Sequence, residues 1–191
     1  MRIVGGTASG RRIVAPMGSE TRPTSERVRE ALFNSLARDI QGARVLDLYG
    51  GSGALSLEAL SWGAKSAVVC EPARRAAEVI RRNARVLGMD TQVKLLVTTA
   101  EKALVMLRPQ SECFDLILCD PPWKQGVSPE VSESLRTVMA GTGWIVVEHV
   151  STEPGPRIAG ASVVRDRRYG TTSLSYYRLE QNTDPEGAQR Y

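Results

Sequence analysis

The stretch that decides the fold is VLDLYGGSGALSLEAL, residues 45–60. An apolar run ends near Asp47, a glycine-rich turn follows, and an apolar segment with helical spacing begins directly after it. Glycines permit a tight turn and let a ligand approach the main chain. The turn leads into a helix N-terminus, whose free N–H groups attract electron-rich groups. The stretch therefore predicts a strand, a ligand-binding loop and a helix in succession.

The same alternation continues along the chain. Apolar runs predict strands at 66–71, 92–98, 114–120 and 143–150, and helical patterns predict helices at 73–88, 100–108 and 128–140. Alternating strands and helices predict an α/β, Rossmann-like fold with a mostly parallel sheet covered on both faces. Two final apolar runs flank Tyr169–Gly170–Thr171 without a helix between them, which predicts an antiparallel C-terminal hairpin.

Both ends of the chain carry additions to this pattern. Residues 2–5 and 11–15 are β-prone runs around small residues and predict an N-terminal β-hairpin. Ser25 is a suitable N-cap for a helix over residues 25–40. We therefore expect an N-terminal arm and loop at 1–24, the main domain at 25–180, and a disordered tail at 181–191.

Composition limits the class of protein. The chain has 191 residues, a net charge of +4 and 42% hydrophobic residues, which is typical of one globular domain. No apolar run approaches the ~20 residues that span a bilayer, and the first residues lack the apolar segment of a secretory signal. We expect a cytoplasmic protein without membrane contact. Cys70, Cys113 and Cys119 lack zinc-type spacing, so we expect reduced core thiols and no metal site.

The glycine loop narrows the choice of ligand. A dinucleotide fingerprint would need a third glycine where Ser56 stands, which disfavours an NAD-type dehydrogenase. Asp47, placed before the glycines, suits a cationic ligand instead. The pattern D-x-x-x-G-x-G resembles class I S-adenosyl-L-methionine-dependent methyltransferases. The resemblance implies that cofactor as ligand, with contacts from Asp47, Tyr49, Gly51 and Gly53, from Glu71 to the ribose hydroxyls, and from Thr99 and Ala100 near the adenine.

A second motif, DPPW at residues 120–123, ends the strand predicted at 114–120. Asp120 and the carbonyl of Pro121 are two fixed acceptors, which suit an exocyclic –NH2 group. Trp123 offers a face on which a base can stack. The motif resembles that of methyltransferases acting on adenine N6, guanine N2 or the glutamine amide. The resemblance implies a catalytic group of Asp120, Pro121, Pro122 and Trp123.

The chain, over essentially its whole length except the tail, resembles the bacterial 16S rRNA guanine-N2 methyltransferase family (RsmD-like). The matching elements are Gly5–Gly6, Gly10–Arg11, Pro16–Met17–Gly18, Thr21–Arg22–Pro23–Thr24, the run from Arg27 to Asn34, and Arg168–Tyr169–Gly170 near the other end. The family implies methylation of a guanine 2-amino group in 16S rRNA, within a small-subunit particle or an assembly intermediate.

Basic residues near the start fit such a substrate. Arg forks match phosphate geometry, so we expect phosphate contacts from Arg2, Arg11, Arg12 and Arg22, with Thr24 and Tyr169 near the target base. Arg27 and Arg29 are expected to be either further phosphate contacts or exposed helix residues. For an enzyme that docks on a large particle we expect a monomer.

Two alternatives stay open at this point. One is an exocyclic-amine methyltransferase acting on adenine N6 in DNA or RNA, or on a protein glutamine; the lack of a separate DNA-recognition domain weighs against DNA. The other is a non-catalytic RNA-binding assembly factor that kept the fold.

Overall fold

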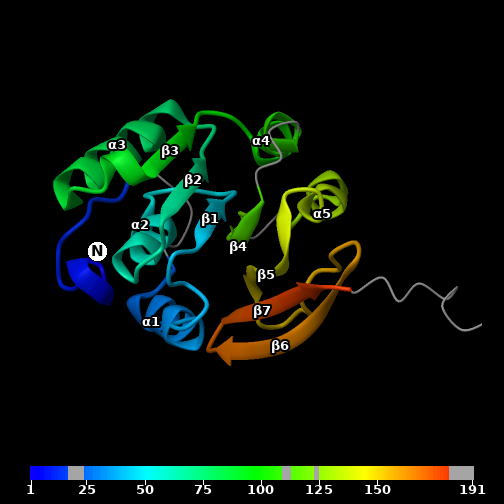
Figure 1. Cartoon of the computed structure of the whole chain (residues 1–191). Helices are drawn as coiled ribbons and strands as arrows, with labels where there is room; N and C mark the ends of the chain where they lie inside the picture. Colours follow the sequence, from blue (N-terminus) through cyan, green and yellow to red (C-terminus); the bar gives the residue numbers. More distant parts are fainter. Residues whose placement is uncertain (17–23, 109–112, 123–124, 181–191) are drawn as a thin grey trace, which may run out of the picture.

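A computed structural model of the chain describes residues 1–16, 24–108, 113–122 and 125–180 (Figure 1). Within these ranges one sheet holds seven strands in the order β3-β2-β1-β4-β5-β7-β6. Strands β1 to β5 run parallel, and β7 is antiparallel to both β5 and β6. The strands are β1 (Arg44–Asp47), β2 (Ser66–Cys70), β3 (Val93–Leu96), β4 (Phe114–Cys119), β5 (Met139–Val150), β6 (Ala161–Tyr169) and β7 (Thr172–Leu179).

Helices cover both faces of this sheet (Figure 1). One apolar cluster packs the first three helices on one face, and a second packs the last two on the other. The helices are α1 (Glu26–Ser35), α2 (Ala54–Ser61), α3 (Arg74–Leu87), α4 (Ala100–Leu107) and α5 (Pro129–Leu135). The mostly parallel α/β sheet with an antiparallel C-terminal hairpin is confirmed.

The strand order reverses between β1 and β4, which lie side by side at the centre of the sheet. The chain leaves β1 toward β2 and β3 on one side, and leaves β4 toward β5 on the other. At such a switch point the loops that follow the two strands diverge and leave room for a ligand. The glycine loop after β1 and the DPPW motif after β4 therefore share one edge of the sheet.

The N-terminal hairpin is present but much shorter than predicted: the N–H of Ile3 donates to the carbonyl of Arg11, and the N–H of Ile13 donates to that of Met1. Residues 2–5 and 11–15 form only one antiparallel bridge, between Arg2 and Arg12, and η1 (Gly6–Ala8) turns the chain between them. The carboxylate of Glu58 in α2 accepts the N–H groups of Val4 (3.0 Å) and Gly5 (2.8 Å), so these groups are not available for a β ladder.

The helix predicted at 128–140 is also shorter than expected. It ends at Leu135, and β5 begins at Met139 instead of residue 143. The N–H of Phe114 donates to the carbonyl of Val138, and Phe114 is paired with Met139. The start of β4 therefore draws this segment into the sheet.

The arm formed by residues 1–16 is packed into the core. Ile3, Ala8 and Ile13 are buried in the cluster that also holds α1 and α2. Gly6 has φ +70°, and a Cβ there would lie 1.9 Å from the carbonyl oxygen of Ser61, so the arm fits α2 only with glycine at this position. Residues 1–24 remain a proposed functional unit, but the described part of the arm shares the core of the main domain.

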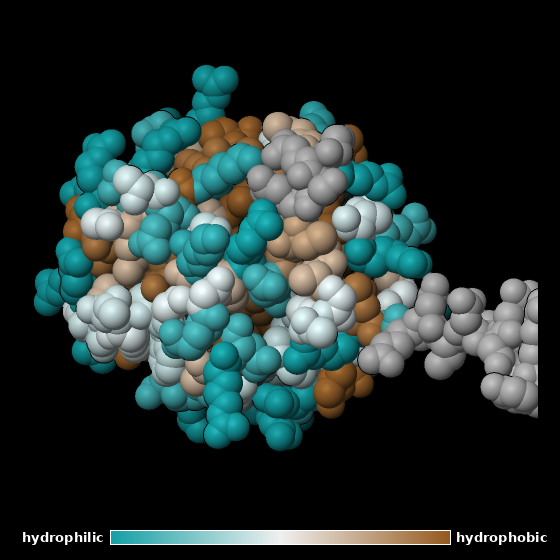
Figure 2. Space-filling view, viewed as in Figure 1, coloured by the Kyte–Doolittle hydropathy of each residue, from teal (hydrophilic) through white to brown (hydrophobic). Residues whose placement is uncertain are grey.

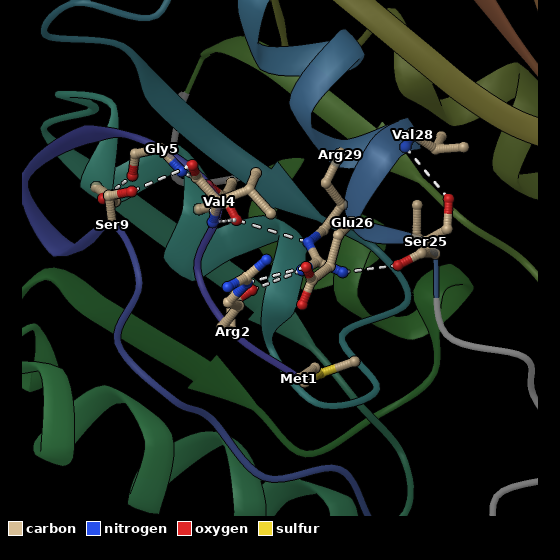
Figure 3. Close-up of polar contacts among 12 residues, drawn as sticks. Met1, Arg2, Val4, Gly5, Ser9, Ser25, Glu26, Val28 and Arg29 are labelled. Carbon is tan, nitrogen blue, oxygen red and sulfur yellow. Dashed lines mark hydrogen bonds and ion pairs between the residues drawn. The ribbon is translucent and has the colours of Figure 1, made fainter.

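Arg29 is not the exposed residue that the helical pattern allowed. Only 1% of its surface is exposed, and its Nε lies 3.5 Å from a carboxylate oxygen of the fully buried Glu58. Its guanidinium donates to the carbonyls of Thr24 (2.6 Å) and Arg2 (2.7 Å). Figure 3 shows Arg29 reaching from α1 to the arm, with the Arg2–Glu26 ion pair beside it. The Arg29–Glu58 pair thus joins α1, α2 and the arm.

The face seen in Figure 2 is mostly hydrophilic, with hydrophobic side chains in separate patches. Cys70 and Cys119 are buried, whereas Cys113, just before β4, is exposed and is not the core thiol we predicted. In the described part of the chain, none of the helices has the length and apolar character that crossing a membrane requires.

Replacing Arg29 with alanine is expected to destabilise the protein by about 3–5 kcal/mol, because Glu58 would keep a buried charge without its partner. Arg27→Ala, on the exposed side of the same helix, is the matched control and should change stability by less than about 0.5 kcal/mol. Urea unfolding of both variants measures the difference. Equal stabilities would contradict the role given to the pair.

Candidate active site

The glycine loop after β1 is held open by backbone geometry and by one carboxylate. Gly51 and Gly53 have φ values of +54° and +78°, in the left-handed region that favours glycine. Glu71, which follows β2, accepts the N–H of Gly51 on one oxygen and the N–H of Ala73 on the other, each at 2.8 Å. Glu71 therefore fixes the loop relative to β2, and the remaining lone pairs of its carboxylate are available to hydroxyl donors.

Asp47 lies at the end of β1 beneath this loop and is fully buried. It accepts a hydrogen bond from the hydroxyl of Ser56 in α2 and one from the N–H of Tyr49 at 3.2 Å. Burial raises the pKa of Asp47 from 3.8 to about 6, with the charge of Glu71 acting in the same direction. Ionised Asp47 therefore destabilises the folded protein, and a positive charge bound nearby would reduce this destabilisation.

Asp120 follows β4 and is partly buried. Its carboxylate lies 2.9 Å from the hydroxyl of Thr24, which in turn lies 2.9 Å from the carboxylate of Glu148 in β5. Burial and the charge of Glu148 raise the pKa of Asp120 well above its ordinary value. The carbonyl of Pro122 accepts the N–H of Gln125 at 2.8 Å, which turns the chain after the motif.

The other predicted cofactor residues lie along the same edge. Thr99 is the N-cap of α4, and its hydroxyl oxygen accepts a hydrogen bond from the N–H of Lys102. Ala100, the next residue, is buried. Tyr49 is partly buried and packs on the second apolar cluster. Burial raises the pKa of its phenol well above the ordinary value, so it stays a neutral donor.

The predicted substrate residues do not gather in one place. Arg2 pairs with Glu26 at 3.0 Å, and Arg11 donates to the carbonyls of Val86 and Leu87 at the end of α3. Tyr169 ends β6 and packs on the first cluster, while Arg12 is exposed on the arm. Among the predicted substrate residues that the structure describes, Thr24 is the one with a hydrogen bond to a predicted catalytic residue, Asp120. Arg22 and Trp123 lie outside the described residues.

Glu148 and the Arg29–Glu58 pair were missed by sequence reasoning. Glu148 had a visible signal, because it is an acid near the end of an apolar strand, as Glu71 and Asp120 are. Glu58 also had one, since it is the single acid in the apolar segment 54–62. A charge within an apolar helix face indicates a buried partner.

The acids at this edge suit the cationic ligand expected from sequence. Asp47, Glu71, Asp120 and Glu148 follow or end four neighbouring strands, β1, β2, β4 and β5. A cofactor with a sulfonium and an ammonium group would offset the repulsion among them, whereas a pyrophosphate would add to it. With the glycine loop at the switch point, this is the arrangement of a class I methyltransferase, whose methyl donor is S-adenosyl-L-methionine.

Comparison with known proteins gives the family. A family model described as "Conserved hypothetical protein 95" matches residues 1–178. The chain is 34% identical over 148 residues to "Ribosomal RNA small subunit methyltransferase D" of Escherichia coli (strain K12), covering 78% of this chain and 71% of that protein. It is 31% identical over 185 residues to "Putative rRNA methyltransferase YlbH" of Bacillus subtilis (strain 168), covering 93% and 98%.

A solved structure agrees over the same length. "Putative methyltransferase yhhF from Escherichia coli" is 32% identical, with a TM-score of 0.80, and the match covers 94% of this chain and 98% of that one. The chain therefore belongs to the "Conserved hypothetical protein 95" family and is an RsmD-like methyltransferase. The resemblance predicted from the N-terminal motifs is confirmed.

Asp47→Asn is expected to stabilise the protein without cofactor by about 3 kcal/mol above pH 6, because a folded-state pKa of about 6 means that ionisation opposes folding. The gain should shrink as pH falls below 6 and disappear below about 4, where Asp47 becomes protonated in both states. Cofactor affinity should fall roughly 10- to 100-fold with the loss of a charge-assisted contact. Urea unfolding across pH and calorimetric titration measure the two effects.

The control is Glu30→Gln, which alters an exposed acid on α1. It should leave both quantities unchanged. An Asp47→Asn variant that binds the cofactor as wild type does would remove Asp47 from the cofactor site.

Proposed function

We propose that the protein transfers a methyl group from S-adenosyl-L-methionine to the exocyclic N2 of one guanine in 16S rRNA. The observation that carries the proposal is the pair of fixed acceptors after β4, the Asp120 carboxylate and the Pro121 carbonyl, beside the glycine loop after β1. The relative from Escherichia coli named as a small-subunit rRNA methyltransferase supports the choice of substrate.

The reaction needs a nitrogen whose lone pair is free. In an aromatic amine that pair is delocalised into the ring, and two acceptors at tetrahedral positions favour the form in which it is localised on nitrogen. S-adenosyl-L-methionine supplies an electrophilic methyl group on a sulfonium. Asp120 and Pro121 would hold the amine for attack on that methyl group, so that positioning and electrostatics would lower the barrier. Asp120 then accepts the proton that the nitrogen loses.

The cofactor contacts are proposed from the geometry of the loop. Glu71 would accept the ribose hydroxyls, Asp47 would face the ammonium group, and the backbone around Gly51 and Gly53 would lie along the cofactor. Thr99 and Ala100 would border the adenine, and Tyr49 would close the site beside them. Trp123 is proposed to stack on the target base.

The arm is proposed to bind RNA phosphates through Arg2, Arg12 and Arg22. A single base must reach Asp120. We propose that this base belongs to a small-subunit particle or an assembly intermediate in the cytoplasm, and that the enzyme acts as a monomer. Arg11 belongs to the same surface, although its guanidinium also caps α3.

Asp120→Ala is expected to abolish methyl transfer, by at least about 10³-fold, while cofactor affinity changes little, because the acceptor of the amine is lost. The measurement is transfer of labelled methyl groups to small-subunit particles, naked rRNA and DNA, followed by mapping of the modified nucleotide. Label confined to N2 of one guanine supports the proposal. Label in DNA alone, or in protein glutamine, would assign the site to the alternative amine substrates.

The assembly-factor alternative makes a different prediction in the same experiment. It expects no transfer from the wild type and no effect of Asp120→Ala on ribosome assembly. Near wild-type turnover in Asp120→Ala would show that the proposed amine contact is wrong.

Arg12→Ala should weaken RNA binding and lower the slope of log affinity against log salt by about one, because one phosphate contact is lost. Its thermal stability should stay unchanged, since Arg12 is exposed. Arg11→Ala is the matched comparison: it should also lower stability by about 1 kcal/mol, because it uncaps the carbonyls at the end of α3. Filter binding at several salt concentrations and thermal melts distinguish the two residues.

A further inference from the structure

The hydroxyl of Thr24 lies between two carboxyl groups. Its Oγ1 is 2.9 Å from Oδ2 of Asp120 and 2.9 Å from Oε2 of Glu148. A hydroxyl carries one hydrogen, so it donates to one carboxylate oxygen at a time. Both short contacts are fully satisfied when the other carboxyl is protonated and donates to Oγ1. The three groups together would then hold one proton more than a threonine and two ionised acids do.

The sheet makes this arrangement stable. Cys119 is paired with Val147 in the parallel β4–β5 ladder, which sets Asp120 beside Glu148. Two ionised carboxylates that contact the same hydroxyl repel each other, and sharing one proton removes the repulsion. Burial raises the pKa of both groups.

The charged groups around the pair come from three other elements. The charge of Arg29 in α1 lowers the pKa of Glu148 and so favours its ionised form, and Arg29 is itself paired with Glu58 of α2. Asp47 of β1 adds negative charge on the side of Asp120. Because Arg29 is shared with Glu58, it neutralises the Asp120–Glu148 pair only in part, which favours retention of a proton.

We propose that Asp120, Thr24 and Glu148 act as one proton-sharing unit. In the free protein the shared proton lies mainly on Asp120, and the positive charge of the bound methyl donor moves it through Thr24 to Glu148, which leaves Asp120 as the ionised acceptor for the amine. This rests on the proposed function of Asp120. With the methyl donor bound, Glu148 donates to Thr24, Thr24 donates to Asp120, and the other oxygen of Asp120 stays open to the substrate. Glu148 is therefore a positioning residue.

The protons and charges balance through the reaction. The nitrogen–methyl bond forms as the sulfur–methyl bond breaks, and the electron pair of the broken bond stays on sulfur. The proton lost by nitrogen goes to Asp120, which becomes neutral, while Glu148 keeps its own proton. The positive charge on sulfur and the negative charge on Asp120 disappear together, so the net charge of the site does not change. Asp120 returns its proton to solvent after product leaves, because it is partly exposed.

The first test needs neither substrate nor cofactor. Urea unfolding of the full-length protein is followed between pH 5 and pH 8 for wild type and Glu148→Gln. A proton taken up on folding makes the unfolding constant rise about tenfold per pH unit, and stability is lost as pH rises toward the folded pKa. Glu148→Gln should lower this dependence by about one proton, since the amide supplies the donor permanently. An unchanged pH dependence would overturn the proposal.

The second test uses methyl transfer. Glu148→Gln should keep kcat within about threefold of wild type, because its amide donates to Thr24 as the protonated acid does, whereas Glu148→Ala should lose about tenfold or more in kcat with little change in KM. Glu153→Gln, an exposed acid just after β5, is the control and should match wild type in both tests. A Glu148→Gln variant as inactive as Glu148→Ala would contradict the proton-holding role.

The two tests separate this proposal from the proposed function. A proton uptake that disappears in Glu148→Gln, in a wild-type protein that methylates no RNA, supports the shared proton and rejects the substrate. Methylation of guanine with identical pH dependence in both proteins supports the substrate and rejects the shared proton.

Discussion

The buried ion pair between Arg29 and Glu58 is the constraint on which the rest of the structure depends. Neither charge has access to water, so each must be satisfied by groups that the fold brings to it. Glu58 accepts hydrogen bonds from the N–H groups of Val4 and Gly5, and Arg29 donates to the carbonyls of Arg2 and Thr24. The arm is thereby fixed by polar contacts as well as by apolar burial. If the arm left this position, Arg29 and Glu58 would lose these hydrogen-bond partners while both charges stayed buried.

The same network reaches the site in two short steps. Arg29 fixes the backbone of Thr24, and the side chain of Thr24 contacts both Asp120 and Glu148. On the other side of the arm, Asn83 of α3 joins Val14 to the carbonyl of Ser52 in the glycine loop. The arm therefore braces both halves of the site. A sheet edge that carries four neighbouring acids is poorly stabilised on its own, and such bracing is how folds keep a strained site in place.

The sequence was sufficient where the signal was local. Asp47, the glycines, Glu71 and Asp120 each stand at the end of an apolar run, and parallel strands with right-handed crossovers bring such ends to one edge. It was insufficient where partners were distant. No residue near Arg29 in the sequence indicates Glu58 on another helix. The extent of the N-terminal hairpin was overestimated because the carboxylate that accepts the N–H groups of Val4 and Gly5 is more than 50 positions away. Glu148 was visible as an acid in a strand, but its neighbour Asp120 emerged only from the β4–β5 register.

The contact between Thr24 and Glu148 spans 124 positions of the chain. During synthesis, the threonine leaves the ribosome long before the strand that carries its partner, and the intervening sheet must form before the two can meet. On the proposed mechanism, a nascent chain would have its glycine loop well before it has a complete acceptor for the amine, so a copy that ends before β5 would not transfer methyl groups.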